Sequence, residues 1–479
     1  MEVISLKFAC FSIITIFVYY LVDPKWRVPL LTVLSLGFIL TYNLYLAVYV
    51  IIFALINFLL GRKLQTTQHK AWIFRVGIGF NLLQLLVLKY SGFIIDPVLD
   101  LMNASVRISQ ISSILVPIGI SYLTLQGIGY LVNIKMGWEK PEEKFFNFLL
   151  YITYFPKFLA GPIERSNHFL PMIRSVQCFS QSRVTEGLRI ALFGFFKKIV
   201  IANQLAPIVN NVYANIDFAN GPSILLLILV QPLYLYFDFS GYTDIAIGFS
   251  KALGIDLLPN FNRPFFSENM TAFWKRFHMS LSSWFNDYVF KQTSFNLRSW
   301  GILASIYALL ITWTLFGIWH GAGWNFMLLG FLQALAIIYE FFSKKWRIRT
   351  FSKMPSQVKL WMSRILTYLF YGTSLVFFFS PDIGTTLTLF ENLFSQNDIV
   401  SVTRIIPLRE LAIPLLFVSI ILGMELLDND FKYLYNKIRT RWIGTSKRSR
   451  LLRVATYYLI MLLIFICYKQ IQEFIYFQF

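Results

Sequence analysis

Residues 314–324, TLFGIWHGAGW, place a histidine at the end of a long apolar run. His320 is one of four histidines in 479 residues, and Gly321 and Gly323 beside it permit a close backbone turn or a close substrate approach. An ionisable residue at membrane depth is a functional candidate, and a histidine near neutrality can accept the proton of a hydroxyl nucleophile. His320 is therefore a candidate general base, with a helix–helix hydrogen bond as the structural alternative.

A second concentration of chemically active residues lies in segment 260–290, NFNRPFFSENMTAFWKRFHMSLSSWFNDYVF. A lipid-facing span with this much charge is very costly, whereas an amphipathic segment leading into a cavity is not. Lys275 and Arg276 have the chemistry to bind phosphates, but by charge alone positive-inside anchoring is the better explanation. His278, taken alone, is more often structural. The other residues of interest in the segment are Trp274 and Asp287.

Polar side chains also interrupt two other apolar stretches. Asp238 and Asp244 lie six positions apart in the run 234–254, where free carboxylates cannot be buried cheaply. We expect them to pair with arginine or to accept helix-terminal N–H groups. In residues 154–169, YFPKFLAGPIERSNHF, prolines and a glycine break the helix beside Glu164.

Familiar catalytic signatures are missing from the chain. It contains no HExxH, GxSxG or Walker sequence, and no GxGxxG in a nucleotide-binding setting. The cysteines, Cys10, Cys178 and Cys467, are too scattered for a disulfide framework or a cysteine metal site. No carboxylate accompanies His320 or His278 in the sequence, which argues against a metal pair.

The composition indicates which elements must position these residues. Hydrophobic residues make up 57% and charged residues 14% of the chain, against about 45–50% and about 25% in soluble domains. This predicts an all-α polytopic membrane protein. The net charge of +19 fits the positive-inside rule and attraction to anionic lipid, and also fits a phosphate-bearing partner of the CoA type. Because the basic residues lie in loops between apolar spans, we expect no nucleic acid partner.

The apolar runs predict about 11–13 transmembrane helices in one membrane domain, residues 1–479. The first run has neither a basic leader nor a small-residue cleavage site, so we take it as a membrane helix and not a signal peptide. Shorter stretches near 145–163 and 265–290 contain proline or charge and predict re-entrant or amphipathic elements. The full-length runs lie near 4–22, 28–42, 44–60, 72–93, 113–133, 187–213, 222–250, 300–319, 323–342, 358–380, 410–427 and 454–474.

Loop charges predict the orientation in the membrane. Loops 343–354 and 432–453 are strongly basic, whereas the loop 381–408 between them has only Arg404 as a basic residue. The basic loops should therefore be cytoplasmic and the C-terminus outside. Counting back along the spans places His320 nearer the outer face and the segment around Arg276 nearer the cytoplasm.

Five segments, in this order, resemble the membrane-bound O-acyltransferase family, and the likeness is greatest to its bacterial branch for alginate O-acetylation. The branch has relatives in peptidoglycan O-acetylation and teichoic-acid D-alanylation. Several motifs in order across about residues 110–335 identify a family far better than an isolated WHG. The segments are LVPIGISYLTLQGIGY (115–130), YFPKFLAGPIER (154–165), YFDFSGYTDIAIG (236–248), FWKRFHMSLSSWFNDYVF (273–290) and GIWHGAGWNF (317–326).

The resemblance implies a helical fold around a tunnel, with His320 as the catalytic residue and His278 as the second functional histidine. A thioester donor, acetyl-CoA, would enter from the cytoplasm as a co-substrate with no bound cofactor, and an acceptor hydroxyl would come from outside. Donor-binding residues would be Trp274, Lys275, Arg276 and Asp287. Tunnel or pocket residues would be Trp319, Trp324, Asn325 and Asp238, although interfacial belts are an equally ordinary use of tryptophan.

The chain also departs from this branch. Phe277 occupies a position that is usually tryptophan, and Asn286 one that is usually arginine. The sequence after Phe290, KQTSFNLRSWG, lacks the Gly-Gly-Asn-Arg loop of alginate-type members. These departures leave the expected fold and chemistry intact but leave the acceptor open.

The C-terminal segment, residues 336–479, ends in the aromatic tail EFIYFQF. An interfacial anchor is the ordinary explanation of such a tail. In relatives, a similar tyrosine-containing end is proposed to carry the acyl group. By that resemblance Tyr476 is a candidate acceptor or relay.

The sequence therefore predicts a multi-pass enzyme of the cell membrane that moves an acetyl group from acetyl-CoA to a hydroxyl of an extracytoplasmic polysaccharide. An extracytoplasmic SGNH or esterase-like partner would complete the transfer. D-alanyl transfer to teichoic acid from a carrier-protein thioester is the alternative within the class. The alternative outside it is a polysaccharide or lipid translocator, which should show inverted repeats that we do not find in the sequence.

Overall fold

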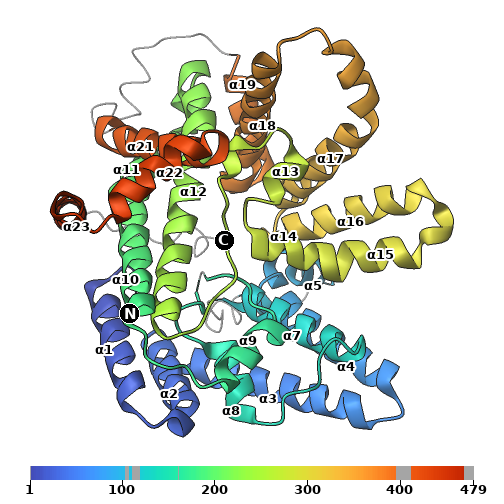
Figure 1. The fold of residues 1–479 in the computed structure, drawn as a ribbon. Helices are drawn as coiled ribbons and strands as arrows, with labels where there is room; N and C mark the ends of the chain where they lie inside the picture. The colour runs from blue at the N-terminus through green and yellow to red at the C-terminus, as the bar shows by residue number, and fades with distance from the viewer. Residues whose placement is uncertain (1, 103–106, 110–118, 160, 395–410, 469–479) are drawn as a thin grey trace. The chain divides into compact units, whose positions relative to one another are not determined.

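The computed structural model describes residues 2–102, 107–109, 119–159, 161–394 and 411–468. Within these ranges the chain forms helices and no strand, which confirms the predicted all-α class (Figure 1). The chain divides into two compact units. The first comprises Met1–Ala191 and Tyr242–Pro259, and the second comprises Leu192–Gly241 and Asn260–Phe479. The predicted motif region, 110–335, thus contributes residues to both units.

Nine helices in the described part of the chain are long and apolar enough to cross a membrane. They account for nine of the twelve predicted runs, and the chain is a multi-pass membrane protein. Three further runs form helices of 14 to 16 residues: α1 (Leu6–Leu21), α2 (Arg27–Leu40) and α7 (Ile120–Lys135). The nine are α3 (Leu44–Thr66), α4 (Lys70–Leu88), Gln181–Ala214, α12 (Gly221–Ala252), α16 (Ile302–His320), α17 (Trp324–Thr350), α18 (Ser356–Phe379), α21 (Ala412–Asp430) and α23 (Lys447–Cys467).

In the first unit, α2 and α3 pack against the short helix α8 (Phe145–Thr153), and α7 packs against the short helix α9 (Ser166–Arg174). Helix α1 packs on α2, and α4 packs on α3 and α7. The predicted helix break lies between α8 and α9, and a buried lysine holds it. Lys157 donates from Nζ to Oε1 of Gln126 (2.9 Å) and to the carbonyl of Tyr151 (2.6 Å). This polar anchoring satisfies irregular backbone that lipid could not satisfy.

In the second unit, α16 and α17 pack closely against each other. A Cβ atom added to Gly317 would lie 2.1 Å from the carbonyl oxygen of Phe326, and one added to Gly330 would lie 2.0 Å from that of Trp313. Small residues at a membrane helix crossing allow this backbone approach. The close pairing fixes the end of α16, where His320 lies.

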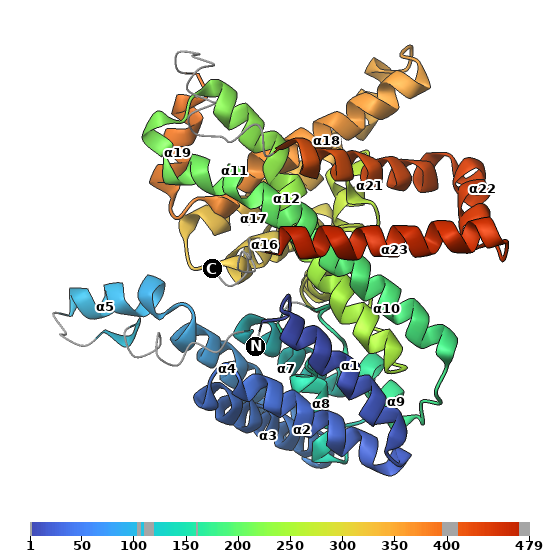
Figure 2. The same ribbon diagram turned by 90° about the vertical axis from the view of Figure 1, so that its left-hand side faces the viewer.

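Further helices contribute to the second unit. The span Gln181–Ala214 begins in the first unit and continues into the second, and it consists of α10 (Gln181–Phe196), a π-helical turn (Lys197–Ala202) and α11 (Asn203–Ala214). Short helices α13 (Met270–Trp274), α14 (Met279–Phe285) and α15 (Lys291–Asn296) precede α16, and α19 (Ile383–Asn392) follows α18. Figure 2 shows α22 (Lys432–Ile443) as the short connection between α21 and α23.

Candidate functional site

His278 and His320 line the same small cavity in the second unit. Both side chains are buried, with 1% and 7% of their surface exposed. The cavity measures about 20 Å³, which is enough for one water molecule. Its other walls are aromatic or aliphatic apart from one glutamine: Leu235, Trp274, Phe277, Phe316, Leu329, Gln333, Tyr371, Leu375 and Phe378.

A strained turn positions His278. The residue has a positive φ of 47°, in the left-handed region that side chains other than glycine seldom adopt, and it connects α13 to α14. Asn260 clamps the next two residues. Its carbonyl accepts from the amide of Met279 (2.9 Å), and its Oδ1 accepts from the amide (3.1 Å) and hydroxyl (2.6 Å) of Ser280. Surrounding structure must over-determine such a conformation, which is characteristic of functional sites.

His320 is the last residue of α16 and lies in an aromatic cage. Its ring centroid lies 5.0 Å from that of Phe316 and 5.4 Å from that of Phe378. Gly321 and Gly323, expected to allow a tight turn or a close approach, have extended backbone instead of a positive φ. A Cβ at Gly321 would lie 2.1 Å from the ring of Phe326. The close approach is therefore made by an aromatic side chain of α17.

The two tryptophans that flank His320 have different environments. Trp319 is buried and contacts both imidazoles, with ring centroids 4.9 Å from His320 and 6.1 Å from His278. Trp324, at the start of α17, is 57% exposed. Asn325, also predicted to line the tunnel, donates to the carbonyls of Phe377 (3.0 Å) and Ser380 (2.7 Å), so its amide ties α17 to the end of α18.

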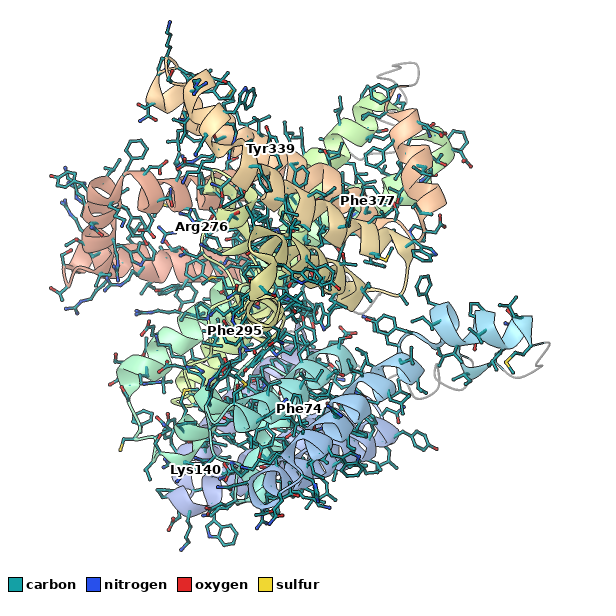
Figure 3. The ribbon with its side chains drawn as sticks, turned by 90° about the vertical axis from the view of Figure 1, so that its right-hand side faces the viewer. Phe74, Lys140, Arg276, Phe295, Tyr339 and Phe377 are labelled. Carbon is teal, nitrogen blue, oxygen red and sulfur yellow. The ribbon has the colours of Figure 1, made fainter. Side chains whose placement is uncertain are left out.

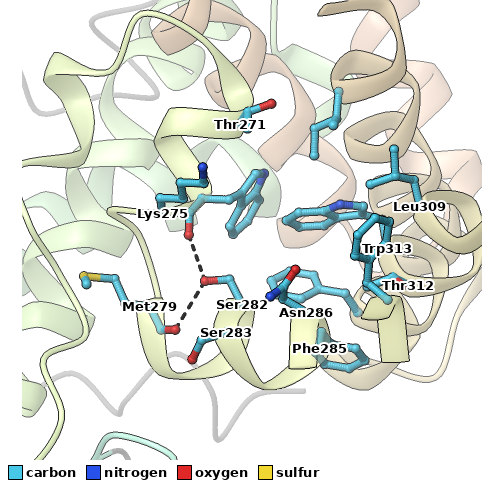
Figure 4. A pocket seen from close by; sticks show the side chains of 14 residues that line it. Thr271, Lys275, Met279, Ser282, Ser283, Phe285, Asn286, Leu309, Thr312 and Trp313 are labelled. Atoms are coloured by element: carbon cyan, nitrogen blue, oxygen red, sulfur yellow. Dashed lines mark hydrogen bonds between the residues drawn. The ribbon is translucent and has the colours of Figure 1, made fainter. Parts of the chain in front are cut away.

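A larger cavity of about 350 Å³, shown in Figure 4, shares lining residues with the histidine cavity and lies beside it. Trp274 and Phe316 line both, so these two side chains form the wall between them. Thr312 is one of the larger cavity's polar lining residues, and in the described structure the buried Oγ1 of this side chain has no hydrogen-bond partner. Its further lining comprises Thr271, Lys275, Met279, Ser282, Ser283, Phe285, Asn286, Phe290, Leu309, Trp313 and Ile337.

Hydrogen bonds hold the indole of Trp274 in this wall. Its Nε1 donates to Oε1 of Gln333 (3.2 Å), whose Nε2 donates to the hydroxyl of Ser374 (3.0 Å). The indole also packs on Trp313 with centroids 4.9 Å apart. Gln333 and Asn260 were not among the residues predicted from the sequence. Gln333 had a visible signal, because it is a polar residue inside an otherwise apolar helical run.

The charged side chains predicted to bind the donor lie in different surroundings. Lys275 is exposed and lines the larger cavity. Arg276, labelled in Figure 3, donates to Oδ1 of Asn429 (3.2 Å). Asp287 forms an ion pair with Lys291, one helical turn further on, at 2.8 Å. Of the charged residues predicted to bind the donor, the structure therefore places Lys275 in the cavity wall.

Asp238 pairs with Lys198, and both side chains are fully buried. The sequence predicted pairing with arginine or with helix-terminal N–H groups, whereas the partner is a lysine on the π-helical turn. Neither residue lines the histidine cavity. Tyr476 lies outside the described residues.

Burial determines the protonation state of His278. Burial lowers the pKa of its imidazole to about 3, because a low-dielectric environment disfavours the charged form. The ring is therefore neutral near pH 7 and can serve as a hydrogen-bonding group. Among the described residues, no group of three or more His, Cys, Asp or Glu could hold a metal ion.

Residues 143–380 match the sequence profile of the membrane-bound O-acyltransferase family. The chain belongs to this family. The matched region contains both histidines, Trp274 and Gln333, so the family signature coincides with the site described above. It also includes helices α12 to α14 and α16 to α18, which contribute lining residues to the two cavities.

Curated relatives carry several different activities. The chain is 31% identical to a probable alginate O-acetylase of Azotobacter vinelandii over 320 residues, covering 65% of this chain and 63% of the relative. It is 27% identical to the peptidoglycan O-acetyltransferase of Helicobacter pylori over 379 residues, covering 72% and 69%. It is 31% identical to the teichoic acid D-alanyltransferase of Bacillus subtilis over 255 residues, covering 50% and 62%. The match to the Azotobacter protein thus spans just under two thirds of that relative.

Proposed function

We propose that this protein transfers an acetyl group from acetyl-CoA to a hydroxyl of an extracytoplasmic polysaccharide. The observation that carries the proposal is the pairing of two buried histidines in one cavity, within the region that matches the family. Relatives named as alginate and peptidoglycan acetylating enzymes support a polysaccharide acceptor. We propose all three details of the reaction: that the transferred group is acetyl, that the acceptor is a polysaccharide, and that the acceptor lies outside the cytoplasm.

The cavity of about 350 Å³ is the proposed donor side. Its aromatic wall suits the extended arm and acyl end of a thioester, and its hydroxyl and amide groups can bind the arm's amides. Lys275 stands at this cavity and is the proposed contact for a donor phosphate. The acyl carbon must then pass Trp274 to reach the histidines.

In the proposed reaction, His320 accepts the proton of the acceptor hydroxyl as its oxygen attacks the thioester carbonyl carbon. The carbon–oxygen bond forms, and the resulting tetrahedral intermediate collapses with cleavage of the carbon–sulfur bond. The leaving thiolate takes the proton from the His320 imidazolium and departs as CoA. A positioned base contributes about 10²–10⁴-fold to the rate. His278, neutral in its buried turn, orients the thioester by a hydrogen bond.

The path beyond the histidines is also proposed. The basic loops favour a cytoplasmic donor and an outward acceptor, with the C-terminus outside. Tyr476 is the proposed relay on that side, and an SGNH or esterase-like partner the proposed recipient. D-alanyl transfer is the second candidate, because the Bacillus subtilis relative is 31% identical and is a teichoic acid D-alanyltransferase.

The test is the acetyl content of purified cell-surface polysaccharide, measured by NMR, at matched membrane levels of protein. Wild type, a deletion strain and His320→Ala are compared, with His69→Ala as the control histidine, because His69 lies in an exposed loop. The proposal expects His320→Ala to match the deletion and His69→Ala to match wild type. Equal acetyl content in the deletion and wild type would exclude this polymer as the acceptor.

The acyl donor is tested on purified protein with labelled acetyl-CoA and, separately, a D-alanyl carrier-protein thioester. The acetyl proposal is supported if wild type consumes acetyl-CoA but not the carrier-protein thioester, and if His320→Ala loses this consumption. Consumption of the carrier-protein thioester alone establishes the second candidate instead.

A further inference from the structure

A separate cavity of about 490 Å³ lies in the first unit. It is formed where α3 ends, α4 begins and α7 ends, and Lys70, Lys135, Trp138, Glu139 and Lys140 are among its lining residues. Because α3 and α4 are both long enough to span a membrane, the three-residue link between them (residues 67–69) must lie at a membrane surface. The cavity is therefore at the level of lipid headgroups.

Three lysines converge on this cavity. Among the described residues, none of Lys70, Lys135 and Lys140 forms an ion pair with a carboxylate. Lys135 is held in place by an aromatic ring, with its Nζ 3.9 Å from the ring centroid of Phe74. Figure 3 labels Phe74 and Lys140 in the first unit. A cation–π contact leaves the remaining N–H donors of an ammonium group available to a ligand.

The acidic residue in the lining is already engaged. Glu139 accepts a hydrogen bond from the hydroxyl of Ser166 on α9. Burial raises the pKa of its carboxyl to about 7, so near neutrality it carries only part of a negative charge. The balance of charge in the cavity is therefore clearly positive.

The aromatic residue of the cavity also fits an interfacial location. Trp138 lines the cavity and is 49% exposed. Amphipathic indole rings concentrate at the headgroup level of membranes, where an apolar face and a polar edge are both satisfied. A polar headgroup and the start of its apolar chains would meet complementary surfaces here.

We propose that this cavity binds the phosphate group of an anionic membrane lipid. Basic pockets at the ends of membrane helices bind such headgroups by charge and by ammonium–phosphate hydrogen bonds. General positive-inside anchoring needs basic residues near the surface but needs no concave site in which they converge. Free phosphate compounds share the same chemistry, so the experiment must separate the two sources.

The experiment titrates full-length purified protein with cardiolipin in a neutral-lipid nanodisc and, separately, with inorganic pyrophosphate. The thermal melting midpoint gives the apparent dissociation constant in each case. The test protein is the triple variant Lys70→Gln/Lys135→Gln/Lys140→Gln. The matched control, Lys345→Gln/Lys353→Gln/Lys447→Gln, removes the same charge from exposed lysines elsewhere.

Each lysine near an anionic surface contributes about 1 kcal/mol, or about fivefold in affinity. The triple variant should therefore bind cardiolipin about a hundredfold more weakly than wild type, while the control triple changes little. Equal melting midpoints in neutral lipid alone verify that the variant is folded. Equal weakening in both triples, or in neither, would overturn the proposal.

A pyrophosphate response that depends on the cavity lysines, with no cardiolipin response, would support the phosphate chemistry but overturn a lipid as its source. The readout is binding in the absence of acetyl-CoA and acceptor. Its outcome is therefore independent of the proposed acyl transfer.

Discussion

The indole Nε1 of Trp274 donates to Oε1 of Gln333 across 3.2 Å, and this bond fixes the wall between the two cavities of the second unit. Gln333 is itself 1% exposed and is held by Ser374 on α18. A buried polar chain of this kind is rigid when every member is satisfied. The position of the indole is thus set by three separate elements of the chain, α13, α17 and α18.

The first prediction concerns the size of the acyl group. Trp274→Ala removes the indole and should join the two cavities, so longer acyl chains gain access to the histidines. We expect the ratio of butyryl-CoA to acetyl-CoA turnover to rise by about tenfold, because one or two methylene groups in an apolar pocket are worth about 1–3 kcal/mol. Turnover of both donors by purified protein measures this ratio.

Two further variants separate the effect of removing the indole from that of disturbing its surroundings. Trp274→Phe retains an aromatic wall and should change the ratio much less. Gln333→Leu leaves the indole in place but removes its acceptor, so it should lower acetyl turnover with a smaller change in the ratio. An unchanged ratio in a folded Trp274→Ala protein would show that Trp274 does not limit acyl size.

A second prediction follows from the neutral state of His278. With a pKa lowered to about 3 by burial, the ring does not change charge between pH 5 and 9. His278→Gln, which keeps a hydrogen-bonding side chain, should therefore lower turnover by the same factor at every pH in this range. The measurement is kcat/KM against pH for wild type and variant. A variant profile that loses an inflection between pH 5 and 9 would contradict the assignment.

The long helices and the functional importance of the two histidines were predictable from local features of the sequence. Apolar runs of spanning length can only be helices when their backbone must satisfy itself. The motif around His320 and the aromatic, charged segment around His278 were visible as local sequence anomalies. Their shared cavity depends on tertiary packing, yet their family resemblance already implied that they work together.

The supporting residues were beyond sequence reasoning because their partners lie far along the chain. Asn260 clamps a turn 20 positions away, and Gln333 accepts from a residue 59 positions away. Periodicity contains no information on such pairs. Asn325 and Asp287 were predicted as site residues because they are polar, but the structure gives both of them structural partners. Asn325 donates to carbonyls at the end of α18, and Asp287 pairs with Lys291 one helical turn further on.

A third prediction concerns the fully buried pair Lys198–Asp238. Lys198→Met removes the cation and leaves the carboxylate at membrane depth, which should destabilise the protein by about 3–5 kcal/mol. The double variant Lys198→Met/Asp238→Asn removes both charges and should recover most of that loss. Thermal melting in detergent measures both. A double variant no more stable than Lys198→Met would show that the two residues do not act as a pair.

The last prediction uses Glu139, whose carboxyl pKa is raised to about 7 mainly by burial. Ser166, Asn133 and Arg174 lower this pKa, whereas Glu142 raises it. Because the folded pKa exceeds the unfolded value, the stabilising effect is complete below about pH 4.5 and is lost as pH rises through about 7. The loss amounts to at most about 3 kcal/mol.

Glu139→Gln keeps the neutral shape of the acid and should flatten this dependence, so that wild type and variant diverge as pH rises from 5 to 8. Melting midpoints of the two proteins across that range, in the absence of anionic ligand, provide the measurement. Glu143→Gln is the control, because it removes an exposed carboxylate from the same loop. Parallel curves for wild type and Glu139→Gln would show that Glu139 does not titrate in this window. The charge of the lysine cavity would then be constant from pH 5 to 8, and its affinity for a phosphodiester headgroup, which itself does not titrate in this range, should be independent of pH.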